Sequence, residues 1–453
     1  MYNSNDTIVA RSTPAGFGAI SIVRLSGDAT KKLIKTSTDL DIELKHKNIY
    51  QTNFFDSQHN PLDQVIITFY QAPNSYTGED LAEINCHGNP NIVQKITDIC
   101  IENGARMANP GEFTQRRFFN NKIDLTQAEG INEFIHSETK ISQKASQQLL
   151  QGQVGKAIHD IKQKIIDNIS LLELELDFTE EEIESTSPSQ IKTNIQDIIE
   201  SIDSLVETYK YGKLVKNGLQ IAIVGPPNCG KSTLLNTLLQ EERAITSAQP
   251  GTTRDFIEES IEHEGYKLNF IDTAGLRKPS NSIEETGINK AFKLIEQSNL
   301  ILFLIDPTQS ISKHKNFDIK KYTNTFEVIN KIDIADNNQI NHFTDKLKLE
   351  NPVLISAKTH TNIDKMCDQI IKWLENKKPS QEDKILTVQR HYNILKDVKQ
   401  ELKDCINTID LGYTSEFIVT DLRTALDTLD SILGKTTNQD ILNNIFSNFC
   451  IGK

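Results

Sequence analysis

The sequence predicts a multidomain protein of mixed α/β and all-α architecture, with an N-terminal α+β domain and an α/β domain inserted into a discontinuous helical domain. Three observations predict this fold class. Short apolar runs alternate with Gly, Pro and Asn turns at the N-terminus, apolar residues later recur at helical spacing, and strand-turn-helix units separate two helical stretches. A chain of 453 residues is long enough for two or three domains that each bury a core.

The changes of pattern divide the chain into four segments. We expect an N-terminal α+β domain at 1–121, a first helical part at 122–216, the inserted domain at 217–377 and a second helical part at 378–453. Because neither helical part has a complete partner of its own, we expect the two to pack together. Three apolar stripes support this packing: Ile158, Ile161, Ile165, Ile169, Leu172 and Leu176; Ile394, Val398, Leu402, Cys405 and Ile409; and Leu422, Leu426, Leu429 and Leu433.

Composition limits the classes of partner. A formal net charge of -13 argues against broad electrostatic wrapping of nucleic acid or an anionic membrane, so any RNA contact should be local or shared with a partner. The six cysteines are scattered without a CxxC pair and no secretory start is present, which is typical of a reduced, cytoplasmic protein. The longest apolar run, Leu300 to Ile305, is too short to cross a bilayer and predicts a buried strand.

A phosphate-binding loop follows the apolar strand predicted at 219–224. In "GPPNCGKST", Gly225, Gly230, Lys231 and Ser232 satisfy G-x-x-x-x-G-K-[ST], and an apolar helix comes next. The glycines let backbone N–H groups turn toward phosphates, Lys231 can reach the β and γ phosphates, and Ser232 can bind Mg²⁺. A match in this context predicts nucleotide binding rather than coincidence.

Four further pieces in order resemble the motif set of the GTPases: "GTTRD" at 251–255, "DTAG" at 272–275, "NKID" at 330–333 and "SAK" at 356–358. The resemblance implies a Ras-like P-loop GTPase domain in which Thr253 completes the Mg²⁺ shell and Asp333 accepts from two N–H groups of guanine. GTP, not ATP, is therefore the expected nucleotide. The expected contacts are Asn228, Cys229, Gly230, Lys231, Ser232, Thr233, Thr253, Asp272, Thr273, Ala274, Gly275, Asn330, Lys331, Asp333, Ser356, Ala357 and Lys358.

Position 276 raises a question about hydrolysis. Ras-like GTPases carry there a glutamine that orients the attacking water, whereas this chain has Leu276. Another group must position the water, and another cation must neutralise the developing charge. The side-chain oxygen of Asn228 suits a monovalent cation, although Asn at this place is also explained by turn conformation alone.

The "CIGK" end, "GTTRD", "DTAGL" and the N-terminal "PGEFTQRRFFNNKIDLTQAEGI" together resemble the tRNA-modification GTPase MnmE (TrmE) family over nearly the whole chain. Two departures touch only the lining of the phosphate loop: Cys229 stands where the family usually has alanine, and Thr233 where serine is common. The resemblance implies a folate-binding N-terminal domain that forms a homodimer. It also implies an FAD-containing partner of the MnmG type, and a tRNA whose wobble uridine gains an aminomethyl or carboxymethylaminomethyl group at C5.

The resemblance further assigns roles in hydrolysis. Asn228 becomes a K⁺ ligand, and Ser247, Gln249 and Thr252 lie in the loop that closes over the ion, with Ser247 and Thr252 also near the nucleotide. Glu284 of "SIEETG" becomes the catalytic carboxylate that positions water. A solvated charge at a helix end is the alternative for Glu284, but the missing glutamine at Leu276 favours the role in hydrolysis.

For the folate site, the resemblance implies Arg24, Glu83 and Lys122, with Lys453 reaching the site from the tail. A carboxylate can accept the paired N–H groups of a pterin while cations meet its carbonyl and its glutamate tail. Without the resemblance, Arg24 and Lys122 are typical of surface charges. The expected ligand is a tetrahydrofolate derivative, either the 5,10-methylene or the 5-formyl form.

The tail "FCIGK" places a thiol near the end of the chain. Prenylation is disfavoured because Lys453 is not a usual final residue and no polybasic segment precedes Cys450. A disordered end with an incidental thiol remains an alternative. The apolar face of Ile441, Leu442, Ile445, Phe446 and Phe449 predicts instead that the last helix docks, which would hold Cys450 beside the folate site as a catalytic group.

Two other functions stay open. A ribosome-assembly or RNA-chaperone GTPase would share every motif between Gly225 and Lys358, but it would have no use for a folate pocket and a terminal thiol. A membrane-remodelling GTPase would require an amphipathic lipid-binding element with a basic face, and the sequence offers none.

Overall fold

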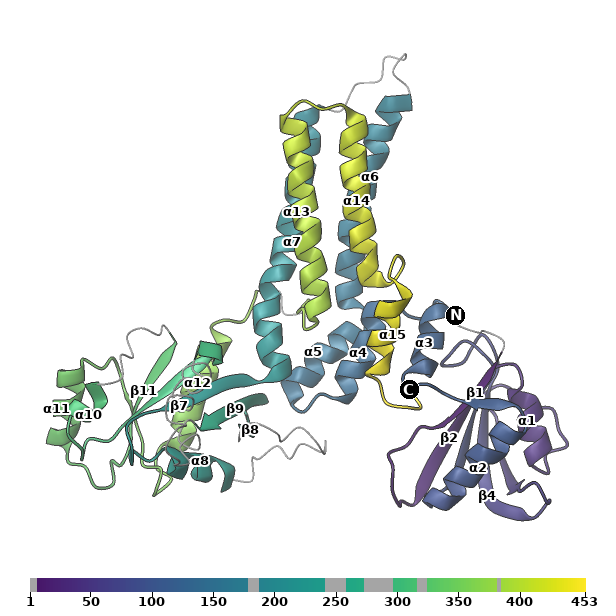
Figure 1. The fold of residues 1–453 in the computed structure, drawn as a ribbon, viewed down its shortest axis with the longest axis horizontal. Helices are drawn as coiled ribbons and strands as arrows, with labels where there is room; N and C mark the ends of the chain where they lie inside the picture. Colours follow the sequence, from purple (N-terminus) through teal and green to yellow (C-terminus); the bar gives the residue numbers. More distant parts are fainter. Residues whose placement is uncertain (1–5, 178–186, 241–257, 273–295, 316–323, 381–383) are drawn as a thin grey trace, which may run out of the picture. The chain divides into compact units, whose positions relative to one another are not determined.

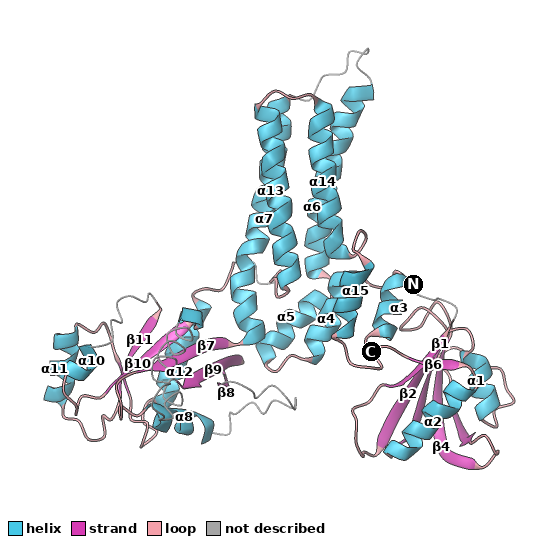
Figure 2. Ribbon diagram, in the orientation of Figure 1, coloured by secondary structure: helices cyan, strands magenta, loops and turns pink. Residues whose placement is uncertain are grey.

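The computed structural model describes residues 6–177, 187–240, 258–272, 296–315, 324–380 and 384–453. The chain forms two compact units. The first unit comprises residues 1–135, 148–201 and 393–453, and the second comprises residues 136–147 and 202–392. Strands form two separate six-stranded sheets, one in each unit (Figure 2).

The first unit begins with a sheet of order β3-β4-β5-β2-β1-β6, antiparallel except where β1 pairs with β6. Its strands are β1 (Thr7–Arg11), β2 (Ile20–Ser26), β3 (Ile49–Phe55), β4 (Pro61–Tyr70), β5 (Leu81–His87) and β6 (Ala105–Met107). The helices α1 (Thr30–Ser37) and α2 (Pro90–Glu102) cover one face (Figure 1). Asn89 begins α2 by accepting a hydrogen bond from the Asn91 backbone N–H, and Pro90 fits the first helical position.

Alternation along the strands separates a core face from an open face. On β2, Val23 and Leu25 are fully buried against the helices, while Ile20 is 64% exposed and Arg24 lies on the same open side as Ile20. Arg24 is paired in register with Glu83 of β5. The open face of the sheet therefore presents an Arg–Glu pair next to exposed apolar side chains.

The rest of the first unit is helical. It contains α3 (Glu112–Phe119), α4 (Leu125–Ile135), α6 (Gln153–Asp177), α14 (Ser415–Leu433) and α15 (Gln439–Ser447), with parts of α5 (Lys140–Leu150), α7 (Pro188–Asn217) and α13 (Gln389–Asp410). The two helical parts of the sequence pack together as expected, with α6 and α14 side by side (Figure 1). Lys162 of α6 and Asp430 of α14 join them by an ion pair of 2.5 Å.

Most of the predicted apolar stripes are buried. Along α6, Ile158 to Leu172 of the stripe are at most 7% exposed, and Leu176 is half-buried. The prediction is wrong in detail at four residues. Ile394, Ile409 and Leu426 are only half-buried, and the neighbours Leu395 and Ala425 are fully buried in place of Ile394 and Leu426. Ile441 is 47% exposed, so it is not part of the face by which α15 docks.

The second unit contains the sheet β12-β11-β10-β7-β9-β8, parallel except for β8 at its edge. Its strands are β7 (Leu219–Val224), β8 (Glu258–His263), β9 (Tyr266–Asp272), β10 (Leu300–Ile305), β11 (Thr325–Ile329) and β12 (Val353–Leu354). Its helices include α8 (Lys231–Gln240), α10 (Ser312–Lys315), α11 (Asn337–Leu347) and α12 (Ile363–Glu375). Every residue of β10 is buried, which confirms the strand predicted from its apolar run. The predicted fold class, with α+β, helical and inserted P-loop parts, is confirmed.

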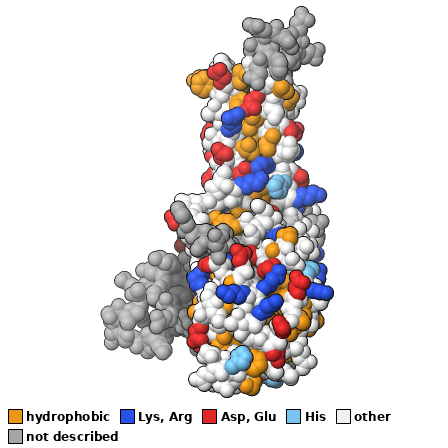
Figure 3. Space-filling model, turned by 90° about the vertical axis from the view of Figure 1, so that its right-hand side faces the viewer, with side chains coloured by type: hydrophobic (Ala, Val, Ile, Leu, Met, Phe, Trp, Pro, Cys, Tyr) orange, Lys and Arg blue, Asp and Glu red, His pale blue; other side chains and the backbone are white. Residues whose placement is uncertain are grey.

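The face drawn in Figure 3 carries Lys and Arg side chains interspersed with Asp and Glu, and isolated apolar side chains between them. Neither sign of charge forms a continuous block among the described residues on this face. The fields of interspersed opposite charges partly offset one another, and salt screens what remains beyond a Debye length of about 10 Å. A polyanion would therefore find only local cationic contacts here.

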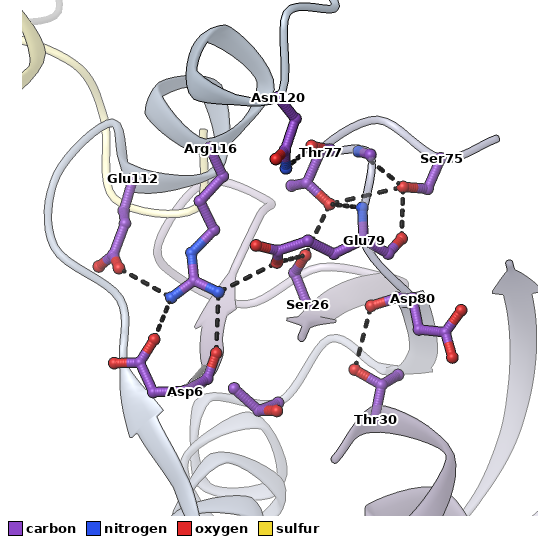
Figure 4. A network of polar contacts seen from close by, with 12 residues as sticks. Asp6, Ser26, Thr30, Ser75, Thr77, Glu79, Asp80, Glu112, Arg116 and Asn120 are labelled. Carbon is purple, nitrogen blue, oxygen red and sulfur yellow. Dashed lines mark hydrogen bonds and ion pairs between the residues drawn. The ribbon is translucent and has the colours of Figure 1, made fainter. Parts of the chain in front are cut away.

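A buried guanidinium connects three segments of the N-terminal domain (Figure 4). Arg116 of α3 is fully buried and forms ion pairs with Asp6, Glu79 and Glu112. Glu79 also accepts a 2.8 Å hydrogen bond from Ser26 of β2. Burial alone would raise the pKa of Glu112, but hydrogen bonds from Arg106, the Asn109 backbone and Arg116 hold it below its ordinary value. The network joins the start of β1, the 75–80 loop and α3.

Replacing Arg116 tests this network. Arg116→Met should destabilise the N-terminal domain by about 3–5 kcal/mol, because it leaves three carboxylates without their shared buried partner. Faster backbone hydrogen exchange in β1 and α3 would reveal the loss. Trp373 is the only tryptophan and lies in the second unit. Its fluorescence therefore follows the unfolding of that unit, and we expect the same unfolding transition in Arg116→Met and in the wild type.

Arg423→Met is the matched control, because the Arg423–Glu173 pair lies in the same unit and is 64% and 39% exposed. An exposed pair contributes about 1 kcal/mol or less. Equal exchange rates in the two variants would contradict the role given to Arg116.

Candidate functional site

The phosphate loop lies between β7 and α8. Gly230 has φ 103°, and a Cβ there would lie 2.2 Å from Nδ2 of Asn330, so only glycine fits. The Lys231 ammonium donates to the carbonyl oxygens of Gly225 and Pro226, both at 2.9 Å. Ser232 and Thr233 are exposed on the first turn of α8. The loop thus presents an ammonium, a hydroxyl and a helix N-terminus together, which fits a Mg²⁺-bound phosphate chain.

The "NKID" and "SAK" segments meet this loop. Asn330 donates from Nδ2 to the carbonyl of Cys229 at 2.9 Å and accepts the Ala357 backbone N–H at 3.0 Å. Ser356 donates from Oγ to Oδ1 of Asp333 at 2.7 Å. Lys358 is exposed next to them. The structure therefore brings the predicted base-recognition residues together, and their contact with guanine stays a prediction.

Cys229 occupies the core below the loop. It is fully buried, and burial raises the pKa of its thiol, with partial opposition from the Lys231 charge. A Cβ at Gly225 would lie 2.8 Å from its sulfur. The thiol therefore packs as a neutral apolar group, and the departure from alanine leaves the backbone of the loop available for phosphate.

Several predicted residues lie outside the part of the chain that the structure describes. They are Ser247, Gln249, Thr252, Thr253, Thr273, Ala274, Gly275 and Glu284, and Asp272 ends β9 with its side chain not described. Their roles stay predictions.

A second constellation lies on the open face of the N-terminal sheet. Arg24 donates from Nε and Nη2 to Oε1 of Glu83 at 3.1 and 2.7 Å. Its guanidinium lies 5.4 Å from the ring centroid of Tyr76 and 5.6 Å from that of Phe113. Lys122 is exposed, and its Cε lies 3.3 Å from where a Cβ of Gly78 would be, beside the loop that carries Tyr76.

The C-terminal tail reaches the same constellation. The carbonyl of Gly452 accepts from Nη1 of Arg24 and from Oγ of Ser12, both at 3.2 Å. The Cys450 side chain is exposed. Burial lowers the pKa of Lys453, and so does the charge of Arg24, with partial opposition from Cys450 and Glu83. These four predicted residues, Arg24, Glu83, Cys450 and Lys453, are thus neighbours.

The docking helix explains why the tail is held. Leu442, Phe446 and Phe449 are buried against α4 and the segment before it, in a cluster with Ile123, Leu125, Ala128 and Ile131. Gly111 makes this contact possible, because a Cβ there would lie 2.6 Å from the carbonyl oxygen of Phe446. The Gly111 N–H also donates to the Cys450 carbonyl at 3.4 Å.

Sequence reasoning missed Ser12, Tyr76, Phe113 and Arg117. The Arg117 guanidinium lies 4.6 Å from the Tyr76 ring centroid, and the Tyr76 hydroxyl lies 3.0 Å from that of Thr114. Phe113 and Arg117 lie on α3, whereas Ser12 and Tyr76 come from two other segments, so no local spacing could have indicated the group. Only the density of basic and aromatic residues in "FTQRRFF" hinted at a cation–aromatic site.

The parallel sheet, the phosphate loop and the joined "NKID" and "SAK" segments define a P-loop GTPase. The family profile of the MnmE helical domain matches residues 125–450, and that of the GTP-binding protein TrmE N-terminus matches residues 7–122. The tRNA modification GTPase MnmE of Aquifex aeolicus is 37% identical, covering 99% of this chain and 100% of the relative. That of Christiangramia forsetii is 36% identical and covers 99% of each. The chain therefore belongs to the tRNA modification GTPase MnmE family, as its motifs predicted.

Membership makes this chain a GTPase of tRNA modification that binds GTP and Mg²⁺. A crystal structure of Era with MgGDPNP and a fragment of 16S ribosomal RNA is 32% identical over 34% of this chain and 56% of that one, with a TM-score of 0.28. Across the described residues, no helix combines the length and apolar character needed to span a bilayer.

Gly452→Ala tests the docking of the tail. Gly452 has φ 92°, and a Cβ there would lie 2.2 Å from the carbonyl oxygen of Arg11, so the variant should release the tail. We expect carboxypeptidase to remove Lys453 several-fold faster than from the wild type, as followed by mass spectrometry of the intact protein.

Gly412→Ala is the control. Gly412 has φ 74°, but a Cβ there would meet nothing within 4 Å, so this variant carries only the conformational cost of about 1–2 kcal/mol. If both variants lose Lys453 at the wild-type rate, the tail is not held by Gly452.

Proposed function

We propose that this chain is the GTP-hydrolysing component of a complex that modifies C5 of the wobble uridine in tRNA, using a one-carbon unit carried by a tetrahydrofolate derivative. The observation that carries the proposal is the docking of the Cys450 tail beside Arg24 and Glu83 through the Gly452 carbonyl. A GTPase that acts only as a switch requires the second unit but gives no reason for this arrangement in the first.

The donor set supports a folate site. Both hydrogen bonds from Arg24 to Glu83 end on Oε1, so Oε2 can accept from a pterin N–H. The Tyr76 ring contacts Arg24 and Arg117 and so helps to hold the Arg24 guanidinium beside Glu83, while Lys122 and Lys453 suit the negative glutamate tail. Bound folate would supply the one-carbon unit. The chain's own residues would bind it, orient it and keep the Cys450 thiol close.

The open face of the N-terminal sheet supports a homodimer. Ile20, Ile49 and Ile66 are 64%, 69% and 47% exposed on the side of the sheet that carries Arg24 and Glu83. A second copy would cover these apolar side chains, which are otherwise costly to expose.

The FAD-dependent MnmG-type partner and the tRNA are included in the proposed complex because the chain belongs to the MnmE family. All six cysteines lie in the described residues and none forms a disulfide, as suits a cytoplasmic protein.

For hydrolysis, Asn228 would bind K⁺ and Glu284 would position the water, with Ser247, Gln249 and Thr252 closing over the ion. The proposal for K⁺ rests on the family resemblance, because the φ of 62° at Asn228 is by itself a left-handed conformation that asparagine tolerates better than most residues. Leu276 cannot orient water, so these groups would replace the missing glutamine.

Nucleoside mass spectrometry of bulk tRNA tests the proposed modification. Host cells that lack the gene should lose C5-modified wobble uridines and regain them with the intact chain. Cys450→Ser should restore GTP turnover but not the modified nucleoside, because the thiol is placed at the folate site and not in the GTPase unit.

Unchanged tRNA together with accumulating ribosomal subunits would favour an assembly GTPase instead. Loss of both activities in Cys450→Ser would indicate that the cysteine is needed for folding rather than chemistry.

GTP turnover in KCl and NaCl at equal ionic strength tests the cation role. We expect turnover at least about tenfold faster in KCl, because a positioned cation stabilises the charge that develops on the phosphates. Asn228→Ala should lose the difference, whereas Cys450→Ser should keep it. Equal rates of the wild type in the two salts would contradict the role of K⁺.

A further inference from the structure

Asp306 is a buried carboxylate directly after β10 that none of the expected motifs includes. Its side chain has 0% exposure, and Oδ2 accepts from the Lys331 ammonium at 2.6 Å and from Nε2 of Gln309 at 2.9 Å. Oδ1 accepts from the Thr308 backbone N–H at 3.0 Å and from the Thr308 hydroxyl at 2.6 Å. A fully buried charge with four donors is held in one position.

Both side chains that donate to Oδ2 also donate to carbonyl oxygens of the phosphate loop. Gln309 donates from Nε2 to the Pro227 carbonyl at 3.2 Å, and Lys331 donates from Nζ to the Asn228 carbonyl at 2.8 Å. Together with the bond from Asn330 to Cys229, three consecutive carbonyls of the loop are held by side chains from outside it. Two of these three contacts depend on Asp306.

The position of Asp306 is itself fixed from the other side. Its backbone N–H donates to Nε2 of His314, which is 1% exposed, and Nδ1 of that ring lies 3.2 Å from the Ser310 carbonyl. Burial alone would raise the pKa of Asp306, but hydrogen bonds from Lys331, Thr308 and Gln309 hold it below its ordinary value. Asp306 therefore stays ionised wherever the protein is folded at neutral pH.

The contact from Lys331 ends at a residue with a left-handed backbone. Asn228 has φ 62°, a conformation that asparagine adopts at a lower cost than other residues except glycine. Neighbouring contacts help to hold such a conformation. Lys331 provides such a contact, and Asp306 orients Lys331.

We infer that Asp306 is a positioning residue that couples the guanine-recognition loop to the phosphate loop at Asn228, and so sets the affinity of the site for its monovalent cation as well as for the nucleotide. The inference rests on the proposed function of Asn228 as a K⁺ ligand. Asp306 acts through Lys331 and Gln309 rather than by touching the nucleotide or the cation itself.

Asp306→Asn is the principal test, since the amide has nearly the same shape but carries no charge and has one accepting atom in place of two. Its NH2 group must then face either Lys331 and Gln309 or the two donors of Thr308. We expect the K⁺ concentration for half-maximal GTP turnover to rise about fivefold or more, and the GDP dissociation constant to rise about tenfold. Saturating K⁺ should restore most of the turnover rate. If Asp306 contributed only to the stability of the fold, added K⁺ would not restore the turnover rate of Asp306→Asn.

Gln309→Ala is a second variant with little risk to folding, because Gln309 is half-buried. It removes the bond to the Pro227 carbonyl and one of the four donors on Asp306. It should shift the half-maximal K⁺ concentration in the same direction by a smaller factor. Asp368→Asn is the matched control. It breaks a carboxylate pair with His263 in the same unit, on α12 and β8, and should leave both quantities at the wild-type value.

The possible outcomes distinguish a wrong role for Asp306 from a wrong assignment of the cation site. If the wild type responds to K⁺ but Asp306→Asn and Gln309→Ala show the wild-type half-maximal concentration, the inference on Asp306 is wrong and the role of Asn228 stands. If the wild type does not respond to K⁺ at all, the proposed cation site is wrong and the inference falls with it. Should Asp306→Asn fail to fold, as judged by circular dichroism and Trp373 fluorescence, Gln309→Ala alone decides between these results.

Discussion

Close backbone contact between the end of the chain and the N-terminal domain is the constraint on which the first unit's candidate site depends. Gly111 and Gly452 each lie where a Cβ would collide with a carbonyl oxygen, at 2.6 Å and 2.2 Å respectively. The tail can therefore approach the domain closely enough for Arg24 to reach the Gly452 carbonyl. Arg24 then serves two purposes, because the same guanidinium orients Glu83 and retains the tail.

Both units contain an irregular segment that is held in place in the same way. In each, carbonyl oxygens of an irregular segment are held by side chains from distant parts of the sequence: Arg24 and Ser12 hold Gly452, while Gln309, Lys331 and Asn330 hold residues 227–229. A loop without helical or strand hydrogen bonds needs such partners wherever it is withdrawn from water. Arginine, lysine and amide side chains can supply them over several ångströms, which allows a fixed loop without regular secondary structure.

The sequence allowed a good part of this to be predicted. The strand at 300–305, the phosphate loop and the pairing of the two helical parts follow from local patterns, and each is confirmed. The stripe residues failed where several apolar neighbours compete for one buried position, as with Ile394 and Leu395. Helical spacing alone gives the face of a helix to about one residue, and the choice within it is made by tertiary packing.

The candidate sites divide in the same way. Motif residues such as Asn330 and Ser356 could be predicted because the segments that carry them resemble the motif set of the GTPases and follow predicted strands. Asp306, Tyr76 and Arg116 could not, because each gains its role from contacts across the fold and stands in the sequence as an ordinary charged or aromatic residue. The family resemblance indicated Arg24 and Glu83, whereas their pairing in register is visible only in the sheet.

The energetics of the tail give a physical reason to regard it as more than a chain end. Ordering a residue costs about 1–2 kcal/mol of backbone entropy, so fixing the last few residues is unfavourable by itself. Burial of Leu442, Phe446 and Phe449 contributes about 1.5–3 kcal/mol for each side chain, and this burial comes before the thiol in the chain. Because the helix is already anchored, only the last four residues remain to be ordered, and the Gly452 contacts act on those. Cys450 is thereby held in a defined place while its side chain stays exposed. A thiol that reacts with a bound substrate requires both properties, whereas a thiol without a function requires neither.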